Sequence, residues 1–167
     1  ASKPVAKHCL RKGLSLLILP GGQQEQLRTT CGKELVYVQR RKGFVKLALE
    51  LGVPLVPVYV FGANDLYKTS HFALSTRMSI LKYLGISLTL GTGYGGSPYC
   101  PLPVATTMVL GEPIPVPKVD HPGAEQVDKV HAQFVAALEE LFEKHKEQLG
   151  YGDRTLEIMR DIRTHRH

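Results

Sequence analysis

The stretch VQRRKGFVKLALELGVPLVPVYVFG, residues 38–62, has the pattern of a helix that leads into a strand. Apolar residues recur at helical spacing across residues 44–51, and Gly52 is typical of a helix C-terminus. Lys46 and Glu50 are four residues apart, so they are predicted to pair on the outer face of this helix. A helix followed directly by an apolar strand is the repeating unit of α/β proteins.

Similar patterns along the chain extend this interpretation. Pro57 interrupts the apolar strand at 54–61, which places that strand at an edge or a bulge. Further strands are predicted at 14–20 (buried), 34–38, 85–90 and within 104–116, helices at 3–12, 71–84 and 124–149, and a polar loop at 21–33. Strand and helix alternate through the first sixty residues, which predicts the α/β class. The tail from residue 151 is short, polar and basic, and we expect it to be loosely ordered.

Composition and charge narrow the class of protein. The 167 residues are 43% hydrophobic and 22% charged, which is typical of one globular domain and argues against disorder. Residues 1–50 carry ten lysines and arginines against three acidic residues, so the net charge of +6 is concentrated there. Such a field favours nucleic acid, anionic lipid or phosphorylated small molecules as partners. Three widely spaced cysteines indicate a reducing compartment. The sequence contains no run of 18 apolar residues, so it predicts no membrane-spanning helix.

Three cations stand at the start of the helix in the opening stretch. Arg40, Arg41 and Lys42 precede Gly43, at a helix end that already carries partial positive charge. A glycine at this point allows a ligand to approach the backbone. The pattern indicates an anion site, most simply for phosphate, while a solvated basic face explains these residues equally well.

Two polar loops follow predicted strands. The loop PGGQQE places Gly21, Gly22 and Glu25 after the first predicted strand, and the segment FGAND ends in Asn64 and Asp65. Ligands bind outside the carboxyl ends of the strands in open α/β sheets, so we expect both loops and the basic helix start to line one edge. An ordinary turn accounts equally well for the glycine pair taken alone.

Other motifs carry weaker signals. The run GTGYGG at 91–96 matches a dinucleotide-binding pattern, but the prolines that follow prevent the helix that such a site needs. His131 and His145 lie beside the apolar stripe of the last helix, and we interpret them as residues at the edge of the core. No histidine has a carboxylate at relay or metal-ligand spacing, so the sequence identifies no catalytic residue and no metal site.

Four segments of the chain resemble the type 2 diacylglycerol acyltransferase family, which includes monoacylglycerol and wax-alcohol acyltransferases. They are PGGQQE, RRKGFVKLALELGVPLVPVYVFGANDLY, GEPIPVPK and VHAQFVAALEELFEKHKEQLG. The resemblance implies a glycerolipid-acyltransferase-like α/β sandwich, incomplete at the N-terminus. Residues 1–150 would be the C-terminal part of the acyltransferase domain, and 151–167 a basic tail. We take as substrate-binding residues Gly21, Gly22, Glu25, Arg40, Arg41, Lys42, Gly43, Asn64 and Asp65.

The resemblance implies a transfer of a fatty acyl chain from acyl-CoA to the hydroxyl of diacylglycerol, which forms triacylglycerol. Acyl-CoA would be a co-substrate, and no separate cofactor is expected. The expected partners are acyl-CoA, diacylglycerol or a similar lipid alcohol, and a membrane surface, with nucleic acid excluded and homo-oligomerisation left open. The implied location is the cytosolic face of the endoplasmic reticulum membrane or the lipid droplet.

The sequence departs from the family pattern in two places. The family's catalytic histidine belongs to a His-Pro-His-Gly motif, which this sequence does not contain. That motif and a hydrophobic hairpin are expected upstream of Ala1, so we expect this chain to be inactive by itself. Ala63 stands where the family usually has glutamate, which leaves the role of that position open.

Three alternatives remain at this point. The first is a non-enzymatic basic module that binds anionic lipid or nucleic acid. The second is a monoacylglycerol or wax-alcohol acyltransferase. The third is a phosphatidic-acid-type acyltransferase, which an E-G-T-R-like block in place of PGGQQE would favour.

Overall fold

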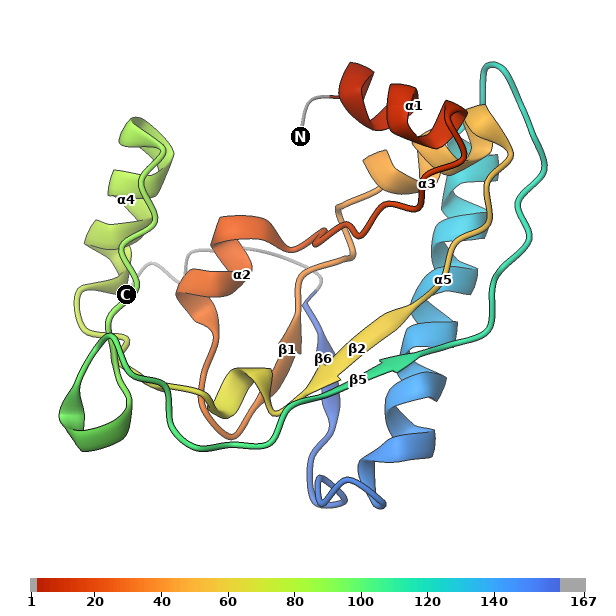
Figure 1. Ribbon diagram of the computed structural model, residues 1–167. Coiled ribbons are helices and arrows are strands. Elements are labelled where there is room, and N and C mark those ends of the chain that lie inside the picture. Colours follow the sequence, from red (N-terminus) through yellow and green to blue (C-terminus); the bar gives the residue numbers. More distant parts are fainter. Residues whose placement is uncertain (1–2, 160–167) are drawn as a thin grey trace.

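The computed structural model describes residues 3–159 and contains helices mixed with small sheets (Figure 1). The helices are α1 (Lys3–Arg11), α2 (Gly22–Arg28), α3 (Gly43–Leu51), α4 (Leu74–Leu84) and α5 (Ala124–Lys146). The strands are β1 (Glu34–Val36), β2 (Val58–Phe61), β3 (Lys68–Thr69), β4 (Gly91–Thr92), β5 (Thr107–Leu110) and β6 (Leu156–Ile158). This content confirms the predicted α/β class.

The strands pair two by two within the described residues. β1 runs parallel to β6, β2 is antiparallel to β5, and β3 is antiparallel to β4. Pro57 lies immediately before β2, and its carbonyl accepts a hydrogen bond from the Gly111 amide. The prediction that this proline keeps the strand from a central position agrees with β2 having one partner among residues 3–159.

The long helix α5 organises the core. Its apolar stripe packs against α3 and β2, and the helix occupies one side of the molecule in Figure 1. Phe142 is completely buried and stacks on Phe61 with the ring centroids 5.2 Å apart, while Tyr59 meets both rings edge-on. A second cluster forms around Val45 of α3 and Val127 of α5. The predicted helix is therefore confirmed, with its end at Lys146 rather than residue 149.

Helix α3 is confirmed with the expected end, because Gly52 adopts the left-handed conformation at φ 66°. The predicted pairing of Lys46 with Glu50 is not what the structure shows. Glu50 is instead bound by Lys3 and Lys7 of α1, at 3.1 and 2.6 Å. The reason is that α1 packs against α3 and brings two lysines to Glu50, which is partly buried there, while Lys46 remains exposed.

The segment 70–103, which we call the arm, lies on the other side of the molecule from α5 (Figure 1). It contains α4, which confirms the helix predicted at 71–84, and β4, and α4 packs against the short helix α2. Arg77 is buried and binds three carbonyl oxygens of the arm, those of Ser70, Phe72 and Leu88. These hydrogen bonds hold the two ends of α4 to the chain around it.

Two predicted strands are absent from the structure. Residues 14–20 form no strand, and the apolar side chains of the run are exposed, up to 81% at Leu19. A strand needs a hydrogen-bonding neighbour, and an apolar run does not say whether one is present. Residues 85–90 also form no strand, because the carbonyls of Leu88 and Leu90 bind Arg77 and the Ser70 amide instead.

Two predicted irregular segments are ordered. Residues 22–28 of the predicted polar loop form α2, since glutamine, glutamate, leucine and arginine all favour helix and Leu27 is buried there. The predicted loose tail is wrong for residues 151–159, because β6 pairs with β1 and Leu156 is part of the core. Residues 160–167 lie outside the described part of the chain. Within residues 3–159, no helix is both long and apolar enough to cross a membrane.

Candidate functional site

The glycine loop and Glu25 form the first part of the candidate site. Glu25 lies in the first turn of α2, and its carboxylate folds back over Gly21, where any Cβ atom would collide with it. The same carboxylate accepts a hydrogen bond from the Tyr37 amide at 2.7 Å. Burial raises the pKa of Glu25, although the Tyr37 amide and the positive charge of Arg41 oppose this increase. Gly22 has φ 63°, a backbone conformation that favours glycine.

The basic start of α3 forms the second part. Lys42 makes an ion pair of 2.6 Å with Asp128 of α5, and Arg41 acts electrostatically on Glu25. The charges of Lys42 and Arg41 are thus offset in part by carboxylates of the chain itself. Arg40 and Arg41 are both exposed. A side chain added to Gly43 would meet open space, so the surface in front of this helix start has room for a ligand.

Asn64 and Asp65 follow β2 and are engaged within the chain. Gly62 makes the turn with φ 83°, a conformation that favours glycine, and a Cβ atom there would also collide with the Ala105 carbonyl. Asn64 donates to the Glu34 carboxylate at 2.7 Å and to the Lys33 carbonyl at 3.1 Å. Asp65 accepts from the Gly32 amide at 2.9 Å. These two side chains tie the turn after β2 to the segment before β1.

Glu34 is the centre of a buried polar network. It is 2% exposed, and its carboxylate accepts hydrogen bonds from Tyr59, Asn64 and Arg154. Arg154 lies 2.8 Å from Glu34 and 2.7 Å from Asp65, so that one guanidinium bridges two carboxylates. Buried charges require such pairing. The network joins β1, the turn after β2 and the segment that leads into β6.

The protonation states of this network follow from its contacts. Burial alone would raise the pKa of Asp65, but hydrogen bonds from Arg154 and the Gly32 amide hold it below its ordinary value. Burial alone would lower the pKa of Arg154, and the two carboxylates raise it instead. Burial and the hydrogen bond to Glu34 raise the pKa of Tyr59, with a contribution from the charge of Glu25. Tyr59 is therefore neutral, and it interacts with both Glu34 of the network and Glu25 of α2.

The structure thus connects all three predicted segments, in two different ways. Glu25 and Arg41 interact electrostatically at the exposed start of α3. Asn64 and Asp65 hold the turn after β2 through Glu34 and Arg154, and their polar groups are occupied. The expectation that all of these residues face a ligand at one sheet edge remains a prediction.

Three members of the network were not among the predicted substrate-binding residues. They are Glu34, Tyr59 and Arg154. A single carboxylate inside the apolar run ELVYV is the signal that could have identified Glu34, since a lone buried charge needs a partner. Arg154 gives no comparable signal, because it lies in a polar stretch where exposed arginines are ordinary.

The histidines of the described part do not bind the site carboxylates. His131 is buried and contacts the Val38 carbonyl through Nε2 at 3.0 Å, and His145 contacts the Leu141 carbonyl, as expected for residues at the edge of the core. His71 contacts Thr30 instead. Residues 3–159 also contain no group of three or more potential metal ligands.

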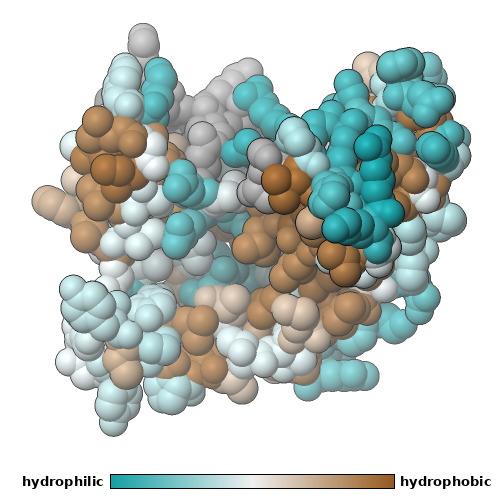
Figure 2. Space-filling model, turned by 45° about the horizontal axis from the view of Figure 1, so that its top comes forward, coloured by the Kyte–Doolittle hydropathy of each residue, from teal (hydrophilic) through white to brown (hydrophobic). Residues whose placement is uncertain are grey.

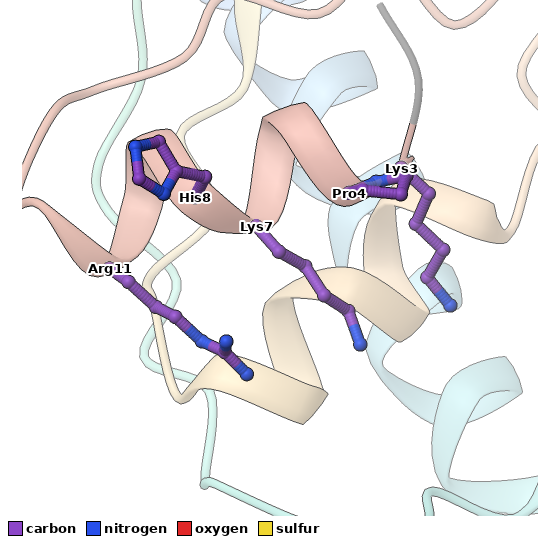
Figure 3. A pocket seen from close by; sticks show the side chains of 5 residues that line it. All are labelled: Lys3, Pro4, Lys7, His8 and Arg11. Atoms are coloured by element: carbon purple, nitrogen blue, oxygen red, sulfur yellow. The ribbon is translucent and has the colours of Figure 1, made fainter.

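A depression of about 430 Å³ lies along α1, and it shares no lining residue with the candidate site (Figure 3). It is lined by Lys3, Pro4, Lys7, His8 and Arg11, which all belong to this helix. Lys3 and Lys7 reach from it toward α3, where they bind Glu50. The depression therefore contains none of the predicted substrate-binding residues.

Comparison with known proteins identifies the family. A family model described as diacylglycerol acyltransferase matches residues 1–159. The chain belongs to the diacylglycerol acyltransferase family. The family that the sequence motifs suggested is thereby confirmed, and the match extends past residue 150 to include β6.

Several curated proteins are similar to the chain. It is 40% identical over 151 residues to human 2-acylglycerol O-acyltransferase 3, an alignment that covers 83% of this chain and 43% of that protein. It is 38% identical to human diacylglycerol O-acyltransferase 2, over 83% of this chain and 38% of that protein. It is 37% identical to mouse diacylglycerol O-acyltransferase 2-like protein 6, with 45% of that protein covered. The chain spans about two fifths of the length of these relatives, and no solved structure matches it.

Proposed function

We propose that the chain is the part of an acyl-CoA-dependent acyltransferase that binds acyl-CoA, in an enzyme that acylates the hydroxyl of diacylglycerol to form triacylglycerol. The match to the diacylglycerol acyltransferase family over residues 1–159 carries the proposal. The exposed start of α3 beside the glycine loop supports it, because acyl-CoA brings phosphates to a basic surface. The proposal includes the α/β sandwich of the glycerolipid acyltransferases.

Arg40, Arg41 and Gly43 would hold the phosphates of acyl-CoA, with Gly21, Gly22 and Glu25 beside them. Lys42 contributes less in this arrangement than the sequence suggests, because Asp128 already binds it. In this proposal Asn64 and Asp65 support the site through the Glu34 network, because their polar groups are already hydrogen-bonded within the chain. No separate cofactor enters this proposal.

The phosphate role is tested in the complete enzyme with Arg41→Ala. The variant should raise the apparent KM for acyl-CoA roughly tenfold, since a charged hydrogen bond to phosphate contributes about 1.5–3 kcal/mol. Lys46→Ala is the matched control, because this exposed lysine lies on the same helix at the end of its first turn, farther from the helix start than Arg41. An unchanged KM in Arg41→Ala, or an equal increase in both variants, would remove the phosphate role.

The chain alone should catalyse no transfer, because no histidine in the described part reaches the site carboxylates and the sequence has no His-Pro-His-Gly motif. A general base within reach of the acceptor hydroxyl is needed to activate it. The test replaces the corresponding 151 residues of human diacylglycerol O-acyltransferase 2 with those of this chain. Retained triacylglycerol synthesis in the chimera, with none from the chain alone, is the expected result. Transfer by the chain alone would overturn this part of the proposal.

The acceptor is tested with the same chimera. We propose diacylglycerol, which the names of human diacylglycerol O-acyltransferase 2 and its relatives specify. The similarity to human 2-acylglycerol O-acyltransferase 3 favours a 2-acylglycerol as the second candidate. A second chimera places the same chain in human 2-acylglycerol O-acyltransferase 3. If this chain determines the acceptor, both chimeras should prefer the same one, either diacylglycerol or a 2-acylglycerol.

The site of action would be the cytosolic face of the endoplasmic reticulum membrane or the lipid droplet, where lipid acceptors are present. Acyl-CoA, the lipid acceptor and the membrane surface are then the partners. Binding of the chain to RNA or DNA that persists at physiological salt would instead support a non-enzymatic basic module.

A further inference from the structure

The arm, residues 70–103, exposes a set of large apolar and aromatic side chains that the rest of the structure does not cover. Phe72 is 78% exposed, Tyr83 is 77% exposed and Tyr99 is 91% exposed. Leu84, Ile86, Leu88, Leu90 and Tyr94 are exposed as well. Figure 2 shows apolar side chains gathered at the surface on the side of the molecule that α4 occupies in Figure 1. A surface of this kind marks an interaction site.

The charges around these side chains indicate which kind of partner the arm fits. Residues 66–111 contain no aspartate or glutamate, although the chain as a whole has 15 acidic residues. Lys68 and Lys82 are exposed in this acid-free region. The Lys82 ammonium lies 5.4 Å from the centre of the Tyr83 ring, so that a cation and an aromatic ring stand together at the end of α4.

From this arrangement we propose that the arm docks on an anionic phospholipid surface. Tyr83 and Leu84 at the end of α4, together with Phe72 and Tyr99, enter the boundary between headgroups and acyl chains. Lys82 of the arm, together with Lys68 of β3 just before it, meets the lipid phosphates. Tyrosine suits this boundary because its ring is apolar and its hydroxyl stays in water. The absence of carboxylates removes the repulsion that an anionic surface would otherwise produce.

The arm is built to present this surface. Arg77 fastens the carbonyls of Ser70, Phe72 and Leu88, which fixes the segments on both sides of α4. Ala73 at the start of α4 has φ 50°, a conformation that residues other than glycine rarely adopt. Phe72 is thereby held outward at one end of the helix, and Tyr83 and Leu84 at the other.

The proposal deepens the proposed function, since an enzyme that acylates lipids must meet them at a membrane. The two can be tested separately, because vesicle binding is measured without turnover. Loss of acyl transfer with vesicle binding intact would count against the proposed function alone. Normal transfer by the chimera without binding through the arm would count against the docking surface alone.

The first experiment measures flotation of the 167-residue chain with vesicles of phosphatidylcholine containing phosphatidylserine. Tyr83→Ser plus Leu84→Ser should weaken binding at least roughly tenfold, since two large apolar side chains leave the lipid. The matched control is Met108→Ser plus Leu110→Ser, which removes exposed apolar groups from β5 outside the arm. Lys82→Gln should weaken binding roughly fivefold, and Lys144→Gln on α5 should leave it unchanged. Equal losses in the arm and control variants would overturn the proposal.

The second experiment places a single fluorophore in the arm. The chain contains no tryptophan, so Phe72→Trp introduces the only indole, and Leu110→Trp places one on β5 as the control. On addition of the same vesicles, the emission of the arm variant should shift to shorter wavelength and be quenched by brominated lipid. An unshifted spectrum would overturn the proposal. So would concentration-dependent self-association that Tyr83→Ser plus Leu84→Ser abolishes, because the partner would then be a second copy of the chain.

Discussion

The body around α5 and the arm around α4 are built from similar side chains but bury them to opposite extents. In the body, Phe142 is completely buried between Tyr59 and Phe61. In the arm, Phe72 is 78% exposed. The comparison teaches that the number of apolar residues in a segment does not determine its burial. What determines it is whether a long amphipathic helix such as α5 has strands to pack against.

The two regions also differ in charge. Residues 66–111 have no acidic side chain, whereas α5 carries Glu125, Asp128, Glu139, Glu140 and Glu143 around its apolar stripe. Such charges keep the outer face of a helix in water. The body is thus suited to water on its outer side, and the arm to an apolar or anionic neighbour.

The sharpest test of this difference is the same substitution in both regions. Phe142→Ala should lower the free energy of unfolding by about 3–5 kcal/mol, because it removes a buried ring and leaves a cavity. Phe72→Ala should change it by less than about 0.5 kcal/mol, because the ring is exposed. Urea unfolding followed by circular dichroism measures both. Comparable losses in the two variants would show that the arm is packed in solution.

The next effect in size concerns the polar network of the body. Arg154→Ala should lower the free energy of unfolding by about 3 kcal/mol, because it leaves the carboxylate of Glu34 buried without its cation. Lys144→Ala, an exposed cation on α5, serves as the control and should have little effect. Arg154→Ala with Glu34→Gln should recover part of the loss, and a double variant as unstable as the single one would contradict this explanation.

The sequence pattern was sufficient to predict those elements whose signals lie within the element itself. The apolar stripe of α5 and the helix α3 with Gly52 at its end are local features, and both are confirmed. The strand predicted at 14–20 is not, because strand formation depends on a partner elsewhere in the chain. The same limit applies to β6, which exists because β1 lies beside it and not because residues 156–158 are strongly apolar.

In the candidate site, too, local motifs could be predicted from the sequence and contacts between distant residues could not. The cations at 40–42 and the glycine pair at 21–22 were found because each is a short local motif. The bridge from Arg154 to Glu34 and Asp65 joins residues that are 120 and 89 positions apart, respectively, and only the folded chain brings them together. The same holds for Asp128, which neutralises Lys42 from another helix.

A smaller effect is expected where α1 is attached to the body. Lys7 and Lys3 hydrogen-bond to Glu50 and lower its pKa from 4.5 to about 2. A carboxyl with a lowered pKa stabilises the folded state above its unfolded pKa, and this contribution disappears as the pH falls toward 2. The protection factors of the α1 amides, which are corrected for the intrinsic exchange rate at each pH, should therefore fall between pH 4.5 and 2, before the core of the body opens.

Glu50→Gln should reproduce the acid state of this contact at neutral pH. Exchange in α1 should become faster by an amount that corresponds to about 0.5–1 kcal/mol, because the lysines are partly exposed. Glu139→Gln, which alters an exposed carboxylate of α5, is the control. If α1 stays equally protected in Glu50→Gln, its apolar contacts with α3 hold it without the ion pairs.

The smallest effect is expected at the start of α3, where the body meets its proposed anion. The side chains of Lys42 and Asp128 are 43% and 54% exposed, so Lys42→Ala should lower the free energy of unfolding by less than about 0.5 kcal/mol, as Lys46→Ala should. Removing Lys42 also takes a positive charge from a helix N-terminus, which offsets part of the lost ion pair. Thermal unfolding at low and high salt measures how much of the net effect is electrostatic, since salt screens both the exposed ion pair and the interaction with the helix dipole. A loss above 1 kcal/mol would show that Lys42 is a structural link between α3 and α5, and that the anion site rests on Arg40 and Arg41.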